Sequence, residues 1–123
     1  MTDITRVSTI DDELVEAFQR LLPQLSPNAI PPDKKELEEM THCGNSVIFI
    51  ARDPVEKVIV GSLTLVLMHT PTGKRAWIED VVVDQNYRGM GIGEALNRAA
   101  IQYASEYGAV SVNLTSRPER EAA

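Results

Sequence analysis

The spacing of apolar residues predicts two helices in the first third of the chain. In Asp11–Leu22 the apolar positions recur at intervals of three and four, and acidic residues at its start complement the positive end of the helix dipole. We expect the N-cap at Thr9 and the end of this helix at the helix-breaking residues Pro23 and Pro27. A shorter, more polar surface helix is expected from Pro31 to about Met40.

Alternating and β-branched segments predict five strands, with a third helix before the last strand. We expect strands over Asp3–Ser8, Ser46–Arg52, Val58–Met68, Ala76–Asp84 and Val110–Thr115, and the helix over Gly91–Tyr107 with Gly108 as its C-cap. Turns are expected around Asp53-Pro54 and from His69 to Lys74. The order of elements indicates an α/β fold with a mixed sheet, whose last strand–helix–strand unit is paired in parallel.

Length and composition narrow the classes of protein. The 123 residues fit one domain spanning 1–123, and contents of 43% hydrophobic and 24% charged residues are ordinary for a globular protein. A net charge of −6 disfavours nucleic-acid binding. The sequence contains neither a secretory signal pattern nor about 20 consecutive apolar residues, so we expect a cytoplasmic protein that does not enter the membrane.

Metal and cysteine chemistry are not expected. His42 and His69 are far apart in sequence and have no third ligand at metal spacing, so no metal site is predicted. Cys43 is the only cysteine, which excludes an internal disulfide, and we do not expect it to act as a nucleophile. Trp77 is expected in the core or in a cleft wall.

A glycine-rich turn lies between the strand ending at Asp84 and the helix that begins near Gly91. It reads Arg88-Gly89-Met90-Gly91-Ile92-Gly93. Free backbone N–H groups and the positive end of a helix dipole meet at such a turn, which favours phosphate binding. The glycines admit a pyrophosphate close to the main chain, and Arg88 adds a charge-assisted contact.

Two common nucleotide-binding patterns do not fit this turn. The dinucleotide pattern G-x-G-x-x-G fails because Glu94 stands at the third glycine position. The P-loop pattern fails because no Gly-Lys-Ser/Thr follows, and the nearby base Arg88 lies upstream. The sequence therefore predicts a phosphate site outside the Rossmann and P-loop classes.

The residues Arg88-x-x-Gly91-x-Gly93 resemble the signature Q/R-x-x-G-x-G/A of the GNAT superfamily of N-acetyltransferases. The preceding Ile78–Asp84 is similar to the fourth strand of that family, and Tyr87 with the helix Glu94–Tyr107 is similar to its third helix. The likeness in element order extends from Met1 to about Arg120, and it is most specific from Trp77 to Leu114.

The resemblance implies acetyl-CoA as co-substrate and no metal. In this family the fourth strand binds the pantetheine arm where it splays from the fifth strand, and the turn amides bind the pyrophosphate. The residues implied to bind the cofactor are Val81, Val82 and Val83 for the arm, Arg88, Gly89, Met90, Gly91, Ile92 and Gly93 for the pyrophosphate, and Asn113 for the opposite wall of the cleft.

Acetyl transfer to an amine requires a base, because a primary ammonium with a pKa of about 10 is almost fully protonated at neutral pH. Glu79 and Asp80 precede the implied pantetheine-binding residues, and simple alternation along the strand would send their side chains to opposite faces. Our hypothesis assigns Glu79 as the base or ammonium-binding group, with Asp80 in its place if a bulge changes the register. Both carboxylates could instead be solvated or salt-bridged residues at a strand edge.

The end of the sequence differs from the resembling family. In that family the chain continues through a further helix and two strands, and a Tyr of this helix protonates the leaving thiolate. The present sequence stops with Ser116–Ala123. We therefore expect a domain truncated after the fifth strand. Tyr87, Tyr103 and Tyr107 occupy other positions and are not that acid. An exposed last strand favours edge pairing, so a homodimer is also expected.

The resulting hypothesis is an acetyl-CoA-dependent N-acetyltransferase that acts on a primary amine of a small molecule or peptide by direct attack. Ile78-Glu79-Asp80-Val81 is reminiscent of the branch acting on glucosamine 6-phosphate, while peptide, antibiotic and polyamine amines stay open. Two alternatives remain. One is a non-catalytic acyl-CoA-binding or interaction module that has lost its C-terminal catalytic half, and the other is an unrelated α/β phosphate binder.

Overall fold

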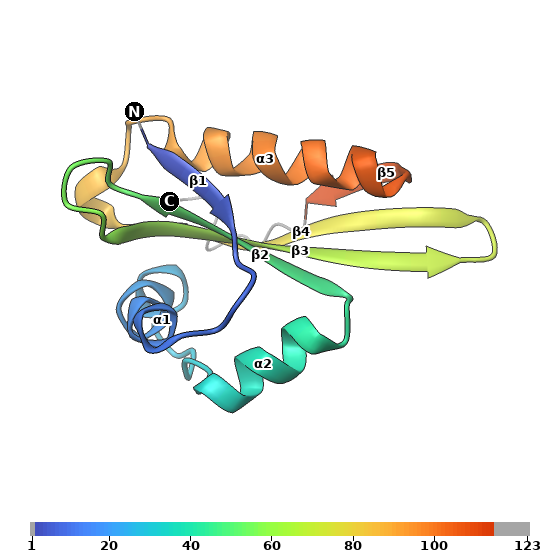
Figure 1. The fold of residues 1–123 in the computed structure, drawn as a ribbon. Coiled ribbons are helices and arrows are strands. Elements are labelled where there is room, and N and C mark those ends of the chain that lie inside the picture. The colour runs from blue at the N-terminus through green and yellow to red at the C-terminus, as the bar shows by residue number, and fades with distance from the viewer. Residues whose placement is uncertain (1, 115–123) are drawn as a thin grey trace.

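The fold is a five-stranded sheet with helices on both faces, seen in a computed structural model that describes residues 2–114 (Figure 1). Helix α3 covers one face, and helices α1 and α2 cover the other. In chain order the elements are β1 (Asp3–Arg6), α1 (Asp12–Leu25), α2 (Lys34–His42), β2 (Ser46–Arg52), β3 (Ile59–Thr70), β4 (Gly73–Val83), the 3-10 helix η1 (Gln85–Tyr87), α3 (Ile92–Tyr107) and β5 (Ala109–Leu114).

The strands lie in sequence order across the sheet. The first three pairings are antiparallel, and β4 pairs with β5 in parallel, with α3 as the crossover helix between them. This confirms the predicted mixed sheet, the hairpin of β2 with β3 and the parallel final unit. The long β3–β4 hairpin extends beyond the rest of the sheet (Figure 1).

Two apolar clusters hold the helices to the sheet. On the α3 face, Leu63 and Leu65 of β3 and Ile78 of β4 pack with Ile92 and Leu96 of α3. On the other face, the cluster joins α1 and α2 to the inner strands through Leu14, Phe18, Leu21, Leu37, Ile48, Ile59 and Val82. The sheet core therefore positions the start of α3, which follows directly after the glycine-rich turn.

Helix α1 differs from the expectation at both ends. Its N-cap is Asp11 and not Thr9, because the Asp11 carboxylate accepts a hydrogen bond from the Leu14 amide at 2.9 Å. Pro23 does not end the helix, which continues to Leu25. Pro23 is exposed and lies in the last turn, where the loss of one backbone donor is tolerated, and Ser26 still donates to Leu22 O.

The β3–β4 turn is shorter than expected. Thr70 pairs with Gly73, so the connection is two residues and not the six of His69–Lys74. The Arg75 guanidinium donates to the hydroxyls of Thr70 and Thr72, each at 2.9 Å, and so links the two sides of the hairpin end. The first strand ends at Arg6, before the expected Ser8. For the last strand, the expected end at Thr115 and the tail Ser116–Ala123 lie outside the described residues.

Candidate functional site

A β-bulge interrupts β4 next to the two candidate carboxylates. Thr64 of β3 is paired with Glu79, whereas Ser62 is paired with Val82, so Asp80 and Val81 together lie opposite the single residue Leu63. Asp80 has a φ of 49°, in the left-handed region that Asp tolerates better than most residues. The expectation of simple alternation at Asp80 is therefore wrong, because the extra residue shifts the phase of the strand.

The shifted phase sets the environment of the three valines that follow. Val82 belongs to the cluster on the α1 and α2 face, while Val81 and Val83 pack against the cluster on the α3 face. Before the bulge, the even-numbered Ile78 packs on the α3 face, so the bulge exchanges the faces of odd and even positions. This exchange keeps apolar side chains on both faces of the sheet beyond Asp80.

One edge of β4 lacks a described strand partner beyond the bulge. The pairing with β5 runs from Lys74 to Ile78, so within residues 2–114 Val82 and Val83 pair only on the β3 side. Asp84 N donates to Val60 O, and because backbone groups alternate along a strand, those of Val83 point away from β3. The Arg88 Nε indeed donates to Val83 O at 3.2 Å on that side.

The glycine-rich turn enters α3 through backbone conformations suited to glycine. Gly89 has a φ of 84° and Gly91 a φ of 80°, both left-handed. Apart from the adjoining residues, no atoms of the described chain lie within 4 Å of where a Cβ would stand on either glycine, so their outer surface is open. Gly91 is the N-cap, and no side chain caps the helix. The first-turn amides of α3 therefore remain available to an anion.

Close packing fixes the position of this helix start. A Cβ on Gly61 of β3 would lie 3.2 Å from Ile92 Cγ2 and 3.3 Å from Leu96 Cδ1, which is tighter than ordinary contact. Ile92 itself is buried. The packing around Gly93 is less tight than around Gly61, since a Cβ added to Gly93 would lie 3.8 Å from Val83 Cγ2. The absence of a side chain at Gly61 thus lets the first turn of α3 approach the sheet closely.

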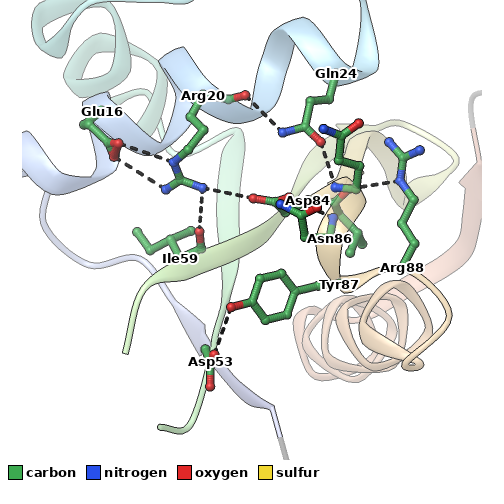
Figure 2. A network of polar contacts seen from close by, with 11 residues as sticks. Glu16, Arg20, Gln24, Asp53, Ile59, Asp84, Asn86, Tyr87 and Arg88 are labelled. Carbon is green, nitrogen blue, oxygen red and sulfur yellow. Dashed lines mark hydrogen bonds and ion pairs between the residues drawn. The ribbon is translucent and has the colours of Figure 1, made fainter. Parts of the chain in front are cut away.

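A polar network fastens the segment between β4 and the turn to α1 (Figure 2). Arg20 Nη1 lies 3.4 Å from Asp84 Oδ2 and donates to Ile59 O at 3.1 Å. The other carboxylate oxygen of Asp84 accepts from the Asn86 amide at 3.0 Å, and Gln24 Oε1 accepts from the preceding backbone amide, that of Gln85, at 2.8 Å. The backbone of η1 is thereby held by side chains of α1.

Tyr87 provides a second connection, toward the β2–β3 turn (Figure 2). Its hydroxyl donates to Asp53 Oδ2 at 2.9 Å. The pKa of Asp53 is lowered, first by the hydrogen bond from the Val55 amide and then by the one from Tyr87. The same bond raises the pKa of Tyr87. Tyr87 therefore stays protonated at neutral pH and acts here as a hydrogen-bond donor.

A cavity of about 280 Å³ opens beside the bulge, between α1, α2 and the sheet. Asp80 and Thr64 line it on the sheet side, and Glu79 is the cross-strand partner of Thr64. The remaining lining is largely apolar and comes from α1, α2 and their connection. A larger cavity, about 630 Å³, lies away from the bulge, between the β1–α1 connection, α2 and Tyr103.

The structure brings most of the expected site residues into one region but leaves others apart. Arg88 contacts Val83, and the turn follows these valines after a single 3-10 turn. Asn113 lies on β5 beside Trp77, and its amide donates to Ser111 Oγ at 3.4 Å.

No group of three metal-binding side chains occurs among residues 2–114. In the same range, no helix combines the length and apolar character needed to cross a bilayer.

Sequence reasoning missed Arg20, Thr64 and Asp84. Arg20 and Asp84 are separated by 64 residues, and nothing in their local sequence indicates that they pair. Thr64 sits in an apolar strand, where one hydroxyl carries no distinct signal. The hypothesis for Asp80 allows for a bulge, but the position of the bulge depends on the register with β3.

Comparison with known proteins identifies the family of this fold. The family model described as "Acetyltransferase (GNAT) family" matches residues 10–123. Glucosamine-6-phosphate N-acetyltransferase from Arabidopsis thaliana superposes with a TM-score of 0.81 at 22% identity, covering 99% of this chain and 86% of that chain. An aminoglycoside acetyltransferase from an uncultured soil metagenomic sample, solved with sisomicin, gives 0.81 at 26% identity, covering 98% and 81%.

A third solved structure, a predicted acetyltransferase from Clostridium acetobutylicum with acetyl-CoA, gives a TM-score of 0.75 at 16% identity and covers 99% of this chain and 85% of that chain. The likeness to the Arabidopsis and Clostridium proteins, below 25% identity, establishes the shared fold. No curated protein matches this chain in sequence.

Proposed function

Since the chain belongs to the acetyltransferase (GNAT) family, we propose that it transfers the acetyl group of acetyl-CoA to a primary amine. The observation that carries this proposal is the combination of an open glycine turn with an uncapped helix start, directly after a strand whose outer edge lacks a described partner beyond a bulge. The turn offers donors to a pyrophosphate, and the strand edge offers donors and acceptors to an extended amide-containing arm.

The residues present fit acetyl-CoA at each of these points. The amides at the start of α3 and the open surfaces of Gly89 and Gly91 would receive the pyrophosphate, assisted by the exposed Arg88. The outward backbone groups of Val83, and of Val81 beside the bulge, would pair with the pantetheine arm. For this the Arg88 guanidinium would move from Val83 O toward the phosphates. Asn113 would contribute to the opposite wall.

On the acceptor side, the carboxylates at the bulge supply the base. When bound, acetyl-CoA provides an activated acetyl thioester. Glu79 or Asp80 would take one proton from the ammonium, and the amine nitrogen would bond to the acetyl carbon. The carbon–sulfur bond would break, and the proton that the nitrogen then loses would pass to the leaving thiolate, which gives free CoA thiol and the amide. Asp80 lines the cavity next to the bulge, which favours it as the group that meets the ammonium.

The cofactor part of the proposal is tested by thermal unfolding with and without acetyl-CoA. Met90 is 68% exposed at the turn and has an ordinary φ, so substitutions there leave the fold intact. Wild type and Met90→Gln should gain roughly 2.7 kcal/mol at a hundredfold excess of acetyl-CoA over Kd. Met90→Glu, which places a negative charge beside the pyrophosphate, should gain much less. Equal stabilisation of all three proteins would contradict the assigned site.

Turnover is tested separately by release of free CoA thiol with a panel of primary amines. Amine-dependent release would support an enzyme. Binding of acetyl-CoA without release across the panel would favour a binding module, and preferential binding of nucleotides over acetyl-CoA would favour an unrelated phosphate binder.

A further inference from the structure

We propose that Gln24 and the hydrogen-bonded pair of Tyr87 with Asp53 are positioning residues, which hold the glycine turn in the conformation that binds the pyrophosphate of acetyl-CoA. This inference rests on the proposed acetyl transfer and adds to it a function for side chains that are distant from the turn in sequence. It follows from the exposure of the turn and from two anchors on the segment that leads into it.

The glycine turn makes few contacts of its own. Residues 88–91 are exposed, and a Cβ on Gly89 or Gly91 would meet no described atoms within 4 Å apart from those of adjoining residues. On the C-terminal side of the turn the chain becomes fixed at Ile92, which is buried in the core. The directions of the turn amides therefore depend on how firmly the residues before the turn are held.

The first anchor comes from α1. Gln24 Oε1 accepts a hydrogen bond from the Gln85 backbone amide at 2.8 Å, and Gln85 is the first residue of η1, which leads into the turn. The Gln24 side chain is itself oriented, because its Nε2 donates to Arg20 O at 3.3 Å. Gln24 is half-buried, so the hydrogen bond to η1 is partly shielded from competing water.

The second anchor comes from the β2–β3 turn. Tyr87 donates its hydroxyl proton to Asp53 Oδ2 at 2.9 Å, while Asp53 Oδ1 accepts from the Val55 amide, also at 2.9 Å. The carboxylate is thus held by its own turn as well as by Tyr87. The Tyr87 ring packs against the cluster on the α3 face, and its backbone amide donates to Asp84 O at 2.8 Å. The residue directly before Arg88 is therefore fixed at both its side chain and its backbone.

The two anchors hold one short segment from different directions. Figure 2 shows Gln24 reaching η1 from α1, while the Tyr87 side chain points away from α1 toward Asp53. A segment fixed at Gln85 and at Tyr87 presents an ordered turn before any ligand arrives, so binding does not carry the entropic cost of ordering it. Loss of an anchor should therefore weaken the binding of a ligand group that contacts the turn, but not of one that contacts only the edge of β4.

The first test uses two acetyl donors that share the thioester and the pantetheine arm, since only acetyl-CoA also carries the pyrophosphate and S-acetylpantetheine lacks it. Tyr87→Phe removes one hydroxyl, and Gln24→Met removes the amide from a side chain of similar length. The Kd of acetyl-CoA, measured by calorimetry, should rise at least about threefold in each variant and at least about tenfold in the double variant. The kcat/KM with S-acetylpantetheine, measured by thiol release with an amine that the wild type uses, should stay within about twofold.

Matched controls make the same chemical changes on the part of α3 that lies far from the turn. Tyr107→Phe removes a hydroxyl from the last residue of α3, and Gln102→Met removes an exposed amide that donates to Glu106. Both controls should leave the Kd of acetyl-CoA within about twofold. Unchanged acetyl-CoA affinity in Tyr87→Phe and Gln24→Met would overturn the inference. Equal losses with both donors would also overturn it, because they would show a general structural role.

NMR relaxation of the ligand-free protein separates failure of this inference from failure of the proposed function. The order parameters of the Gly89 and Gly91 amides should fall in Tyr87→Phe and Gln24→Met, while those of Leu63 and Leu65 in the core of β3 should keep their wild-type values. Wild-type order parameters at both glycines would refute the anchors. Absence of acetyl-CoA binding by the wild type would refute the proposed function, and the order parameters would then still decide whether the anchors hold the turn.

Discussion

Arg20 of α1 and Asp84 at the end of β4 form an ion pair, with the guanidinium Nη1 3.4 Å from the carboxylate Oδ2. The Asp84 side chain is 11% exposed and the Arg20 side chain 31%, so the pair is shielded from much of the solvent. Because Asp84 also accepts the amide of Asn86, the pair links α1 to the backbone that leads into the glycine turn. Helix α1, on one face of the sheet, thereby supports the loop between the end of β4 and the glycine turn.

Replacing Arg20 should therefore lower the free energy of unfolding more than replacing Glu16, the other ion-pair partner of Arg20. Arg20→Met leaves the Asp84 carboxylate and Ile59 O without their donor, and we expect the free energy of unfolding to fall by about 1–3 kcal/mol. Glu16→Gln removes only an exposed ion pair with the same guanidinium and should cost less than about 0.5 kcal/mol. Urea unfolding of both variants measures the difference, and similar costs would show that the Asp84 pair contributes little.

Two glycines of the turn should respond oppositely to alanine. Gly91→Ala forces a Cβ onto a residue with a φ of 80° and should lower the free energy of unfolding by about 1–2 kcal/mol. Gly93→Ala sits inside α3, where its Cβ would make an ordinary 3.8 Å contact with Val83, and should raise stability by about 0.5–1 kcal/mol. Thermal or urea unfolding distinguishes them. A loss in Gly93→Ala would mean that Val83 cannot accommodate the methyl group.

Removal of the base should change the pH dependence of acetyl transfer. If Asp80 accepts the proton of the ammonium, Asp80→Asn should lower kcat/KM by about 10²–10⁴-fold and change the pH profile of kcat/KM. Glu79→Gln should have the smaller effect. A dominant effect of Glu79→Gln would reverse the assignment, and full activity with an unchanged pH profile in both variants would remove both residues from the mechanism.

The bond between Glu13 and Arg52 should make stability depend on pH. The carboxylate accepts two hydrogen bonds from the guanidinium, at 2.6 and 2.9 Å. This hydrogen bonding is the largest cause of the lowered pKa of Glu13, and burial acts in the opposite direction. A pKa lowered by folding stabilises the protein above the pKa of the unfolded chain. That contribution is lost as the pH falls through the lower pKa of the folded state.

We therefore expect Glu13→Gln to reduce the free energy of unfolding by about 0.5 kcal/mol at neutral pH, since half of the Glu13 side chain is exposed to solvent. The difference from wild type should shrink at pH values where Glu13 is protonated. Glu39→Gln, at an exposed position of α2, serves as the control for removing one negative charge. Urea unfolding at pH 7 and pH 3 tests this, and a constant difference would show that the ion pair is not responsible.

The pattern of apolar residues was sufficient for the order and type of the elements, because each helix and strand has its own period. It was not sufficient for their ends. Pro23 reads as a helix breaker, but its exposed place in the last turn of α1 allows the helix to continue. The sequence pattern overestimates the length of the β3–β4 turn. Cross-strand pairing extends to Thr70 and Gly73 and stabilises residues with weak strand preference in the strands.

The site divides in the same way. Arg88–Gly93 could be predicted as a phosphate site because its glycines are contiguous in the chain and stand before a helix. The orientation of Asp80 could not be predicted, since it depends on which residues of β3 lie opposite. The cavity beside it is formed by residues from α1, α2 and two strands, which no local pattern connects.

The sequence by itself determined the mixed α/β class, the position of the glycine turn and the likeness to the acetyltransferase family, because these depend on periodicity and on residues adjacent in the chain. Only the tertiary structure decided the bulge at Asp80, the pairing of Arg20 with Asp84 and the apolar character of the cavity. These depend on strand register and on contacts between residues far apart in sequence, which form when the helices pack against the sheet.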